Sequence, residues 1–360
     1  MSAKVTITNG KAEMAALQGV GVWWENDVIQ AGRLQPGASI SEWVQAAGMG
    51  YTFRKAKLMY AADRKGLDIR TDEDNVAIVR SDTGASMGIV GSGYNIVQPY
   101  EVLEFFRDLV DSSGFQLTTA GTLFGGRRMW ALAKITDAKI SGWDQIGAYL
   151  LLSTSSDGSM ATEGRKTTVC VVCNNTLSMA LRRDNARARV SHRVSMAMTQ
   201  LRAELGLERS KEEFAAWIES ANALTKAKVS DATADDLVLR LLRGATADET
   251  LAAQVNEASI GTGDTFAQLM AGPFVPKDME AAQRRPRGAD AILELFEGAG
   301  RGATQVGRSG TAWGLVNAVT EYVDHIKPSK SDDQRVANAW WGNGDQLKAE
   351  VMSMALDQFA

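Results

Sequence analysis

The sequence contains very little cysteine and histidine. Its 360 residues include two cysteines and two histidines. Two thiols cannot form a disulfide framework, and the single Cys170-x-x-Cys173 pair lacks the second pair of ligands that a structural zinc site needs. The pair lies in an apolar run, residues 167–173, which favours two small buried side chains over a redox or metal site. Free thiols and the absence of an apolar segment after Met1 predict a cytoplasmic protein.

Long apolar runs and a strong excess of one charge are also missing. No stretch approaches the roughly 20 apolar residues of a membrane-spanning helix, so no membrane partner is expected. The chain has 39 basic and 43 acidic residues, for a net charge of −4. This excludes binding to nucleic acid by bulk charge alone, but it is compatible with a local basic face. With 45% hydrophobic residues and only six prolines, the chain has the composition of a folded protein.

The first half of the chain shows both helical and strand patterns. Apolar spacing and flanking turn residues predict helices and strands in alternation. The predicted helices cover residues 41–47 and 99–113, the predicted hairpins cover 76–90 and 115–135, and further strands cover 51–60, 148–152 and 167–172.

The second half shows almost no strand signal. Helices are expected at residues 196–205, 211–224, 235–242 and 310–325, with Gly206 and Gly244 as stops. An irregular connection at about 272–308 carries one short helix near 289–296. The sequence therefore predicts an α+β fold. A mixed antiparallel-sheet body (1–194), with β-hairpins and a packed helix, precedes a mostly helical domain (195–360).

A polar segment follows the strand at 148–152. Its hydroxyls and turn-forming glycine could hold a phosphate, although Ser, Asp and Gly are also ordinary turn residues. The candidate residues are Ser153, Ser155, Asp157, Gly158 and Ser159. Asp157 with Ser153 or Ser155 would be the centre of a metal-dependent enzyme acting on nucleic acid. No Walker loop, HExxH or GxSxG motif supports an enzyme, so catalysis is the less favoured interpretation and no cofactor is expected.

A basic run is the most distinctive feature of the sequence. Five arginines against one aspartate give a local charge of +4, and guanidinium groups suit bidentate phosphate contacts. The candidates are Arg182, Arg183, Arg187, Arg189 and Arg193, with Arg165 and Lys166 upstream, and Arg127 and Arg128 beside Phe124 and Trp130 at a hairpin tip. Cations interleaved with aromatic rings are typical of single-stranded nucleic-acid binding. A solvated basic face and a contact to an acidic subunit surface are the alternatives.

Nine tryptophans are many for a chain of this length. Trp23-Trp24 and Trp340-Trp341 are adjacent pairs, in which one ring tends to point away from the other. An outward ring suggests a protein interface. The pairs are therefore candidate anchors for a protein partner.

Several long strings, taken in order, resemble a known family. They are residues 79–84, 94–99, 104–106, 119–121, 126–133, 150–159, 172–177, 310–314 and 317–322. Their order and spacing resemble those of phage- and plasmid-related proteins that carry a long domain of unknown function. The resemblance covers nearly the whole chain. The sequence departs from the family pattern at Val22–Glu25, where a Pro-Trp-His-Gly-like string is expected, and at Ser156, where a histidine often stands.

The resemblance implies a protein of a mobile element. Such elements often encode single-strand annealing proteins, which form rings or filaments and bind DNA in a basic groove on a β–β–β–α body. By this analogy we expect a DNA-binding protein that acts as a homo-oligomer, binds single-stranded DNA and anneals strands in recombination. The second hypothesis for such a protein is a non-enzymatic counter-defence or regulatory protein that binds a host protein, with the tryptophan pairs as anchors.

Overall fold

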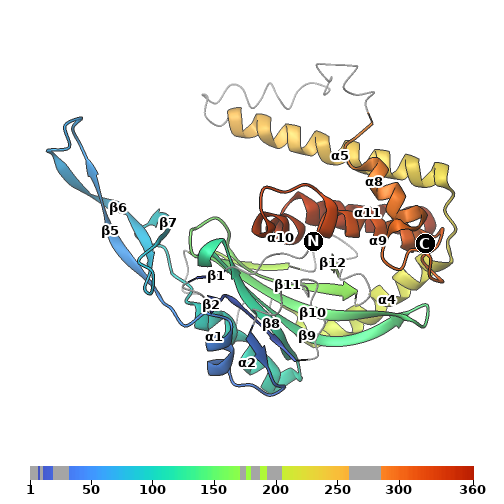
Figure 1. The fold of residues 1–360 in the computed structure, drawn as a ribbon, viewed down its shortest axis with the longest axis horizontal. Coiled ribbons are helices and arrows are strands. Elements are labelled where there is room, and N and C mark those ends of the chain that lie inside the picture. Colours follow the sequence, from blue (N-terminus) through green and yellow to red (C-terminus); the bar gives the residue numbers. More distant parts are fainter. Residues whose placement is uncertain are drawn as a thin grey trace. The chain divides into compact units, whose positions relative to one another are not determined.

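The computed structural model describes residues 7–8, 11–18, 32–170, 176–179, 187–192, 205–258 and 285–360 (Figure 1). It has the α+β architecture that the sequence predicts, with strands in the first half and helices in the second. The chain divides into two compact units, residues 1–219 with 329–337 and residues 220–328 with 338–360. This division falls inside a helix, whereas the sequence places the boundary at residue 194. No described helix is both long and apolar enough to cross a membrane.

An eight-stranded sheet forms the core of the first unit. Its strands are β3 (Met14–Leu17), β4 (Gly32–Leu34), β8 (Gln116–Leu123), β9 (Arg128–Ile140), β10 (Asp144–Ser155), β11 (Thr162–Cys170), β12 (Thr176–Ser178) and β13 (Arg187–Val190). The order is β12-β11-β10-β9-β8-β3-β4, and β13 also pairs with β11. Only β3 and β4 run parallel. The hairpin predicted at residues 115–135 is confirmed as β8–β9.

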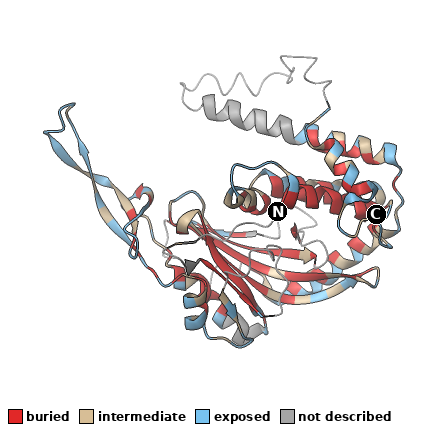
Figure 2. Ribbon diagram, in the orientation of Figure 1, coloured by how far each residue is buried: buried red, intermediate tan, exposed pale blue. Residues whose placement is uncertain are grey.

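The central strands of this sheet are buried almost throughout (Figure 2). Leu150, Leu151 and Leu152 are consecutive in β10, and each is at most 2% exposed. Because successive side chains of a strand point to opposite faces, such a run requires that both faces be covered. The central part of the sheet is therefore interior, whereas Asp137 and Lys139 of β9 and Arg189 of β13 are exposed.

Two helices pack beside this sheet. Helix α1 (Ile40–Ala46) begins at a capping box, in which Ser39 accepts from the Glu42 backbone N–H and Glu42 accepts from that of Ser39. Helix α2 (Pro99–Ser113) begins at the predicted proline and packs on β8 and β9. Both helices were expected from local sequence signals, and both are confirmed.

A separate three-stranded sheet consists of β5 (Phe53–Ala61), β6 (Ile69–Arg80) and β7 (Ser86–Gly91) in that order. The predicted β6–β7 hairpin is confirmed. The sequence did not predict that β5 turns directly into β6. Asp63 makes this turn, because its carboxylate accepts from the backbone N–H groups of Leu67 and Asp68. Beyond β7, residues 58–72 continue as a two-stranded ribbon, called the arm below (Figure 1).

A short two-stranded sheet, β1 (Ile7–Thr8) and β2 (Lys11–Ala12), precedes β3. The later part of the chain is helical, as expected. Its helices are α4 (Ser210–Lys226), α5 (Asp231–Ala258), α8 (Ala289–Glu294), α9 (Ala312–Glu321), α10 (Asp332–Trp341) and α11 (Asn343–Phe359). The predicted stop at Gly244 is wrong, since α5 continues through it to Ala258. Gly244 is exposed, and an exposed glycine inside a helix costs only about 1 kcal/mol. The predicted helix at residues 196–205 lies outside the described residues except for its last one.

Candidate nucleic-acid interface at one end of the large sheet

The tip of the β8–β9 hairpin is the most unusual backbone of the first unit. Phe124 adopts a φ of 56°, and it is one of two described non-glycine residues with positive φ. The left-handed region is unfavourable for a residue with a Cβ, and such residues occur often in binding sites. The following Gly125 and Gly126 have φ of 68° and 94°. A Cβ on Gly126 would lie 2.7 Å from Tyr51 Oη, so glycine is required for this turn.

Buried charges hold the tip in place. The Arg80 guanidinium donates to the Gly125 carbonyl oxygen at 3.0 Å and to Asp82 Oδ1 at 2.7 Å. It lies 3.6 Å from the centroid of the Tyr51 ring. Its Nη1 is 2.6 Å from Glu13 Oε1. Burial lowers the pKa of Arg80, but the hydrogen bond to Asp82 and the charges of Tyr51 and Glu13 outweigh it, so the net direction is upward. The arginine therefore stays charged and fixes the turn.

A carboxylate fixes the other side of the tip. The backbone N–H of Phe124 donates to Asp333 Oδ2 at 2.7 Å. Burial raises the pKa of Asp333, while the hydrogen bond from Phe124 opposes that shift. Two residues that are far apart in the sequence, Arg80 and Asp333, thus hydrogen-bond to the backbone of the tip.

Three of the predicted nucleic-acid residues meet at this tip. The Phe124 ring is half-buried, and the Arg128 Cζ lies 5.5 Å from its centroid. Arg127 is exposed beside them. Burial lowers the pKa of Arg128, and the charge of Asp157 opposes that shift. The arrangement gives one flat face and two cations within a few residues.

The polar segment Ser153–Ser159 lies next to the tip, because Ser155 pairs with Arg128 across β10 and β9. The backbone N–H of Ser156 donates to the Arg127 carbonyl oxygen at 2.8 Å. Asp157 Oδ1 accepts from the Ser159 backbone N–H at 2.9 Å. Gly158 has a φ of 75°, and it is exposed together with Ser159.

Two of the three serine hydroxyls predicted to hold a phosphate or a metal are in the interior. Ser153 and Ser155 are at most 1% exposed. Ser155 Oγ donates to the Met160 carbonyl oxygen and accepts from the Met160 backbone N–H. This serine therefore closes the loop and is not directed at solvent. Among the described residues, no group of three or more His, Cys, Asp or Glu side chains could hold a metal ion.

A histidine supports the same loop. His192 stacks on Tyr94 with ring centroids 4.6 Å apart, and its Nδ1 lies 3.0 Å from the Asn95 carbonyl oxygen. Its Nε2 lies 3.3 Å from Thr154 Oγ1. Burial lowers the pKa of His192 below its ordinary value. Nothing in the spacing of these residues indicates that they meet, because they are up to 98 positions apart.

The basic run is divided by the structure. Arg182, Arg183 and Arg193 lie outside the described residues, and Arg187 is placed in β13 without its side chain being described. Arg189 also lies in β13, and its side chain is 58% exposed. Its Nε is 2.7 Å from Glu163 Oε2, so part of its charge is already neutralised.

Three further candidates are buried and do not belong to an exposed surface. Trp130 is 3% exposed in β9. The Arg165 side chain is 4% exposed and lies 3.6 Å from Glu163. The Lys166 side chain is 2% exposed and forms an ion pair with Glu213. Their positions beside exposed cations in the sequence gave no sign of this burial, which depends on elements that cover β9 and β11.

The cysteine and tryptophan motifs also contribute to the core where they are described. Cys170 is buried at the end of β11, with Sγ 3.5 Å from Asp144 Oδ1. Trp340 is 3% exposed and makes an edge-on contact with Trp341. Cys173, Trp23 and Trp24 lie outside the described residues.

Comparison with known proteins places the chain in a family whose members share a region without an assigned role. Residues 86–341 match the family model described as a domain of unknown function, DUF932. No curated protein and no solved structure is detectably similar to the chain. The matched region includes β7 to β13, the hairpin tip and most of the helical part. On this match, the chain belongs to the DUF932 family.

Proposed function

We propose that this chain binds single-stranded DNA at the tip of the β8–β9 hairpin, and that it serves strand annealing in a phage or plasmid. One observation carries the proposal. The half-exposed Phe124 ring is held by a left-handed backbone between Arg128, over its face, and the exposed Arg127. A flat ring stacks on a base, and adjacent guanidinium groups contact the phosphates on either side.

The rigidity of the tip favours binding. Arg80 and Asp333 hydrogen-bond the tip backbone from two sides. A group that is already ordered loses less conformational entropy when its ligand binds. The unfavourable φ of Phe124 is then maintained by these contacts, and the ring is presented before DNA arrives.

Arg189 extends the proposed contact from the tip across neighbouring strands of the large sheet. Arg128 pairs with Ser155, Ser153 pairs with Glu163, and Glu163 pairs with Arg189. Three strand spacings and two residues along a strand separate Arg128 from Arg189, which is roughly 15 Å. A flexible single strand bends to follow such a path more easily than a duplex.

The test is anisotropy of a fluorescent single-stranded oligonucleotide at several salt concentrations, with unlabelled duplex as competitor. Each phosphate contact to a single strand contributes about −0.7 to the slope of log K against log salt, so Arg127→Ala with Arg128→Ala should reduce the slope by about 1.4. Arg240→Ala is the control, because Arg240 is 52% exposed and belongs to α5 of the second unit. An unchanged slope in the double variant, or equal competition by duplex, refutes the proposal.

A further inference from the structure

The second unit contains a pocket of about 590 Å³, lined by residues of α5, α8, α11 and the turn that follows α9. This volume is within the range of roughly 300–1,000 Å³ that is usual for small-molecule sites. All of its lining residues belong to the second unit. None of them takes part in the proposed DNA contact, so the pocket is a separate feature of the chain.

The charged groups that line this pocket are cations. Arg287 and Lys327 are among the described lining residues, whereas no Asp or Glu is. Arg285, two positions before Arg287, forms ion pairs with Asp235 and Asp290. Arg287 is exposed and forms no ion pair with a described residue. Its guanidinium is therefore available to an anion from outside the chain.

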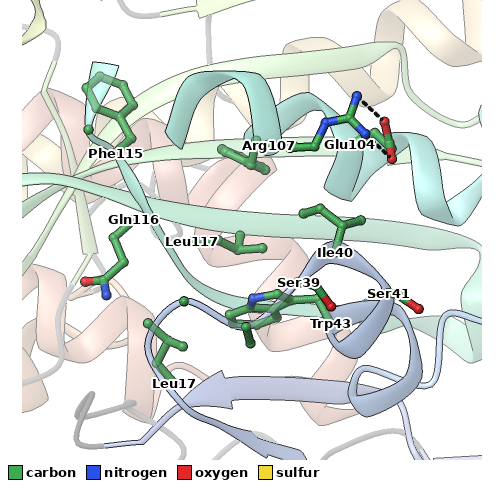
Figure 3. Close-up of a pocket in the computed structure, with 14 residues that line it drawn as sticks. Leu17, Ser39, Ile40, Ser41, Trp43, Glu104, Arg107, Phe115, Gln116 and Leu117 are labelled. Carbon is green, nitrogen blue, oxygen red and sulfur yellow. Dashed lines mark hydrogen bonds and ion pairs between the residues drawn. The ribbon is translucent and has the colours of Figure 1, made fainter. Parts of the chain in front are cut away.

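A larger cleft in the first unit differs in this respect. It has a volume of about 880 Å³ and is lined mainly by residues of α1, α2 and the start of β8 (Figure 3). The two charged residues in its lining, Glu104 and Arg107, pair with each other at 2.9 Å. That cleft therefore offers a ligand no free charge, whereas the pocket of the second unit does.

A tyrosine in the lining of this pocket has an unused hydroxyl. Tyr322 is 6% exposed, and its hydroxyl forms no hydrogen bond with a described residue. Burial raises the pKa of Tyr322, so the hydroxyl keeps its proton and remains a donor. A buried donor without an acceptor is unfavourable, and an anion in the pocket supplies the acceptor.

The backbone around the pocket fixes this tyrosine. Residues Tyr322–Ile326 form a π-helical turn after α9, in which the Lys327 N–H donates to the Tyr322 carbonyl oxygen at 2.7 Å. Turns of this kind are frequent at functional sites. A Cβ on Gly288 would overlap Tyr322 Oη, and Gly288 has a φ of 92°, so glycine is required there. The hydroxyl is thus held against the loop that carries Arg287.

Helix α11 begins at the pocket, since its first residue, Asn343, is in the lining. The helix has 17 residues, and its N-cap, Gly342, has no side chain that could cap it. The N-terminus of a helix carries a partial positive charge that favours an anion. Asp345 of its first turn is 5% exposed and does not line the pocket. The helix end therefore acts in the same sense as Arg287 and Lys327.

The rest of the lining is apolar. Leu242, Ala291, Ile326 and Leu347 contribute aliphatic side chains from four elements. Ile326 is 44% exposed, and it is one of eight large apolar side chains that are exposed among the described residues. Tyr322 supplies the one aromatic ring among the described lining residues. This lining suits an aliphatic chain better than a nucleobase, which binds by stacking on aromatic rings.

We propose that this pocket binds a small amphipathic anion, an aliphatic chain with one phosphate or carboxylate head. Arg287, Lys327 and the N-terminus of α11 attract the head, and the Tyr322 hydroxyl donates to it. The aliphatic side chains remove the ligand's chain from water. This inference goes beyond the proposed DNA contact, and its experiments contain no DNA, so the two proposals succeed or fail separately.

The first experiment is isothermal titration calorimetry of the full chain with octyl phosphate and with octanoate, below their critical micelle concentrations. We expect saturable binding of at least one of them, and the tighter of the two identifies the head group. Inorganic phosphate and octanol carry the head or the chain alone, and each should bind more weakly by a factor of about ten or more. Failure of both amphipathic anions to bind, or equal binding of either fragment, overturns the proposal.

The second experiment locates the site by titrating variants with the anion that binds. Arg287→Ala removes the exposed guanidinium and Tyr322→Phe removes only the hydroxyl, so each should weaken binding about 2- to 10-fold. Ala291→Phe, at a half-exposed position of α8, should fill the pocket and abolish binding. Lys226→Ala is the matched control, because Lys226 is an exposed cation of the second unit outside the lining. Arg287→Ala and Ala291→Phe variants that bind like the control place the ligand elsewhere and overturn the proposal.

Discussion

Arg80 and Glu13 form a buried ion pair of 2.6 Å, in which neither side chain is more than 3% exposed. Glu13 precedes β3 of the large sheet, and Arg80 is the last residue of β6 in the three-stranded sheet. Arg80 also donates to the Gly125 carbonyl oxygen at the hairpin tip. One guanidinium thus joins the eight-stranded and the three-stranded sheet to the turn that presents Phe124.

Loss of this arginine should strongly destabilise the first unit. Arg80→Leu leaves Glu13 buried without a counter-charge, and breaking a buried pair in this way costs about 3–5 kcal/mol. Arg70→Ala is the control, because its ion pair with Asp68 is exposed and is worth at most about 1 kcal/mol. Urea denaturation measures both. Similar small losses in the two variants would contradict this role for Arg80.

The two glycines of the tip should differ in their tolerance of alanine. Gly125→Ala meets no atom within 4 Å, so only its φ of 68° is unfavourable, which costs about 1–2 kcal/mol. Gly126→Ala adds a Cβ 2.7 Å from Tyr51 Oη and 3.0 Å from Arg80 Nη1, so its loss in the free energy of unfolding should be larger. Equal losses would show that the turn relaxes away from Tyr51.

Phe124 should contribute to DNA affinity through stacking and not through charge. Phe124→Leu keeps an apolar side chain at this position but removes the flat face, and stacking of one base is worth about 1–3 kcal/mol. We expect weaker binding of the single-stranded oligonucleotide with an unchanged salt slope. Tyr100→Leu, at a 47% exposed ring on α2, is the control. If both variants bind like the wild type, the ring does not contact DNA.

His192 should make the folded state sensitive to acid. Burial lowers its pKa below 6.5, so between the folded value and 6.5 the unfolded chain binds more protons than the folded one. The free energy of unfolding therefore rises with pH in that window and falls as the solution is acidified below 6.5. His192→Gln should lose this part of the pH dependence in urea titrations, while the carboxylates contribute equally to both proteins. Parallel pH profiles would contradict the effect.

Elements with local signals were predictable. The Ser39–Glu42 capping box starts α1, Pro99 starts α2, and the turn around Gly84, with a φ of 69°, joins β6 to β7. Each signal acts within a few residues, where the chemistry of a side chain decides the backbone geometry. The hairpin tip at Phe124 was likewise predicted, together with the two arginines that lie beside it.

Elements that depend on distant contacts were not predictable. Arg165 and Lys166 read as surface cations, yet they are buried beside Glu163 and Glu213, and Glu213 is 47 residues from Lys166. His192 follows β13, and the pairing of β13 with β11 brings it to its partners Tyr94 and Thr154. The arm was hidden because its exposed apolar residues look like those of a core strand.

The sequence by itself determined the α+β class, the order of most strands and helices, and the combination of Phe124 with Arg127 and Arg128, because propensity, capping and turn chemistry are local. Tertiary structure decided which cations face solvent, which serines close a loop, and which apolar side chains of the arm stay exposed. Burial depends on what packs over a residue, and that neighbour is usually far away along the chain.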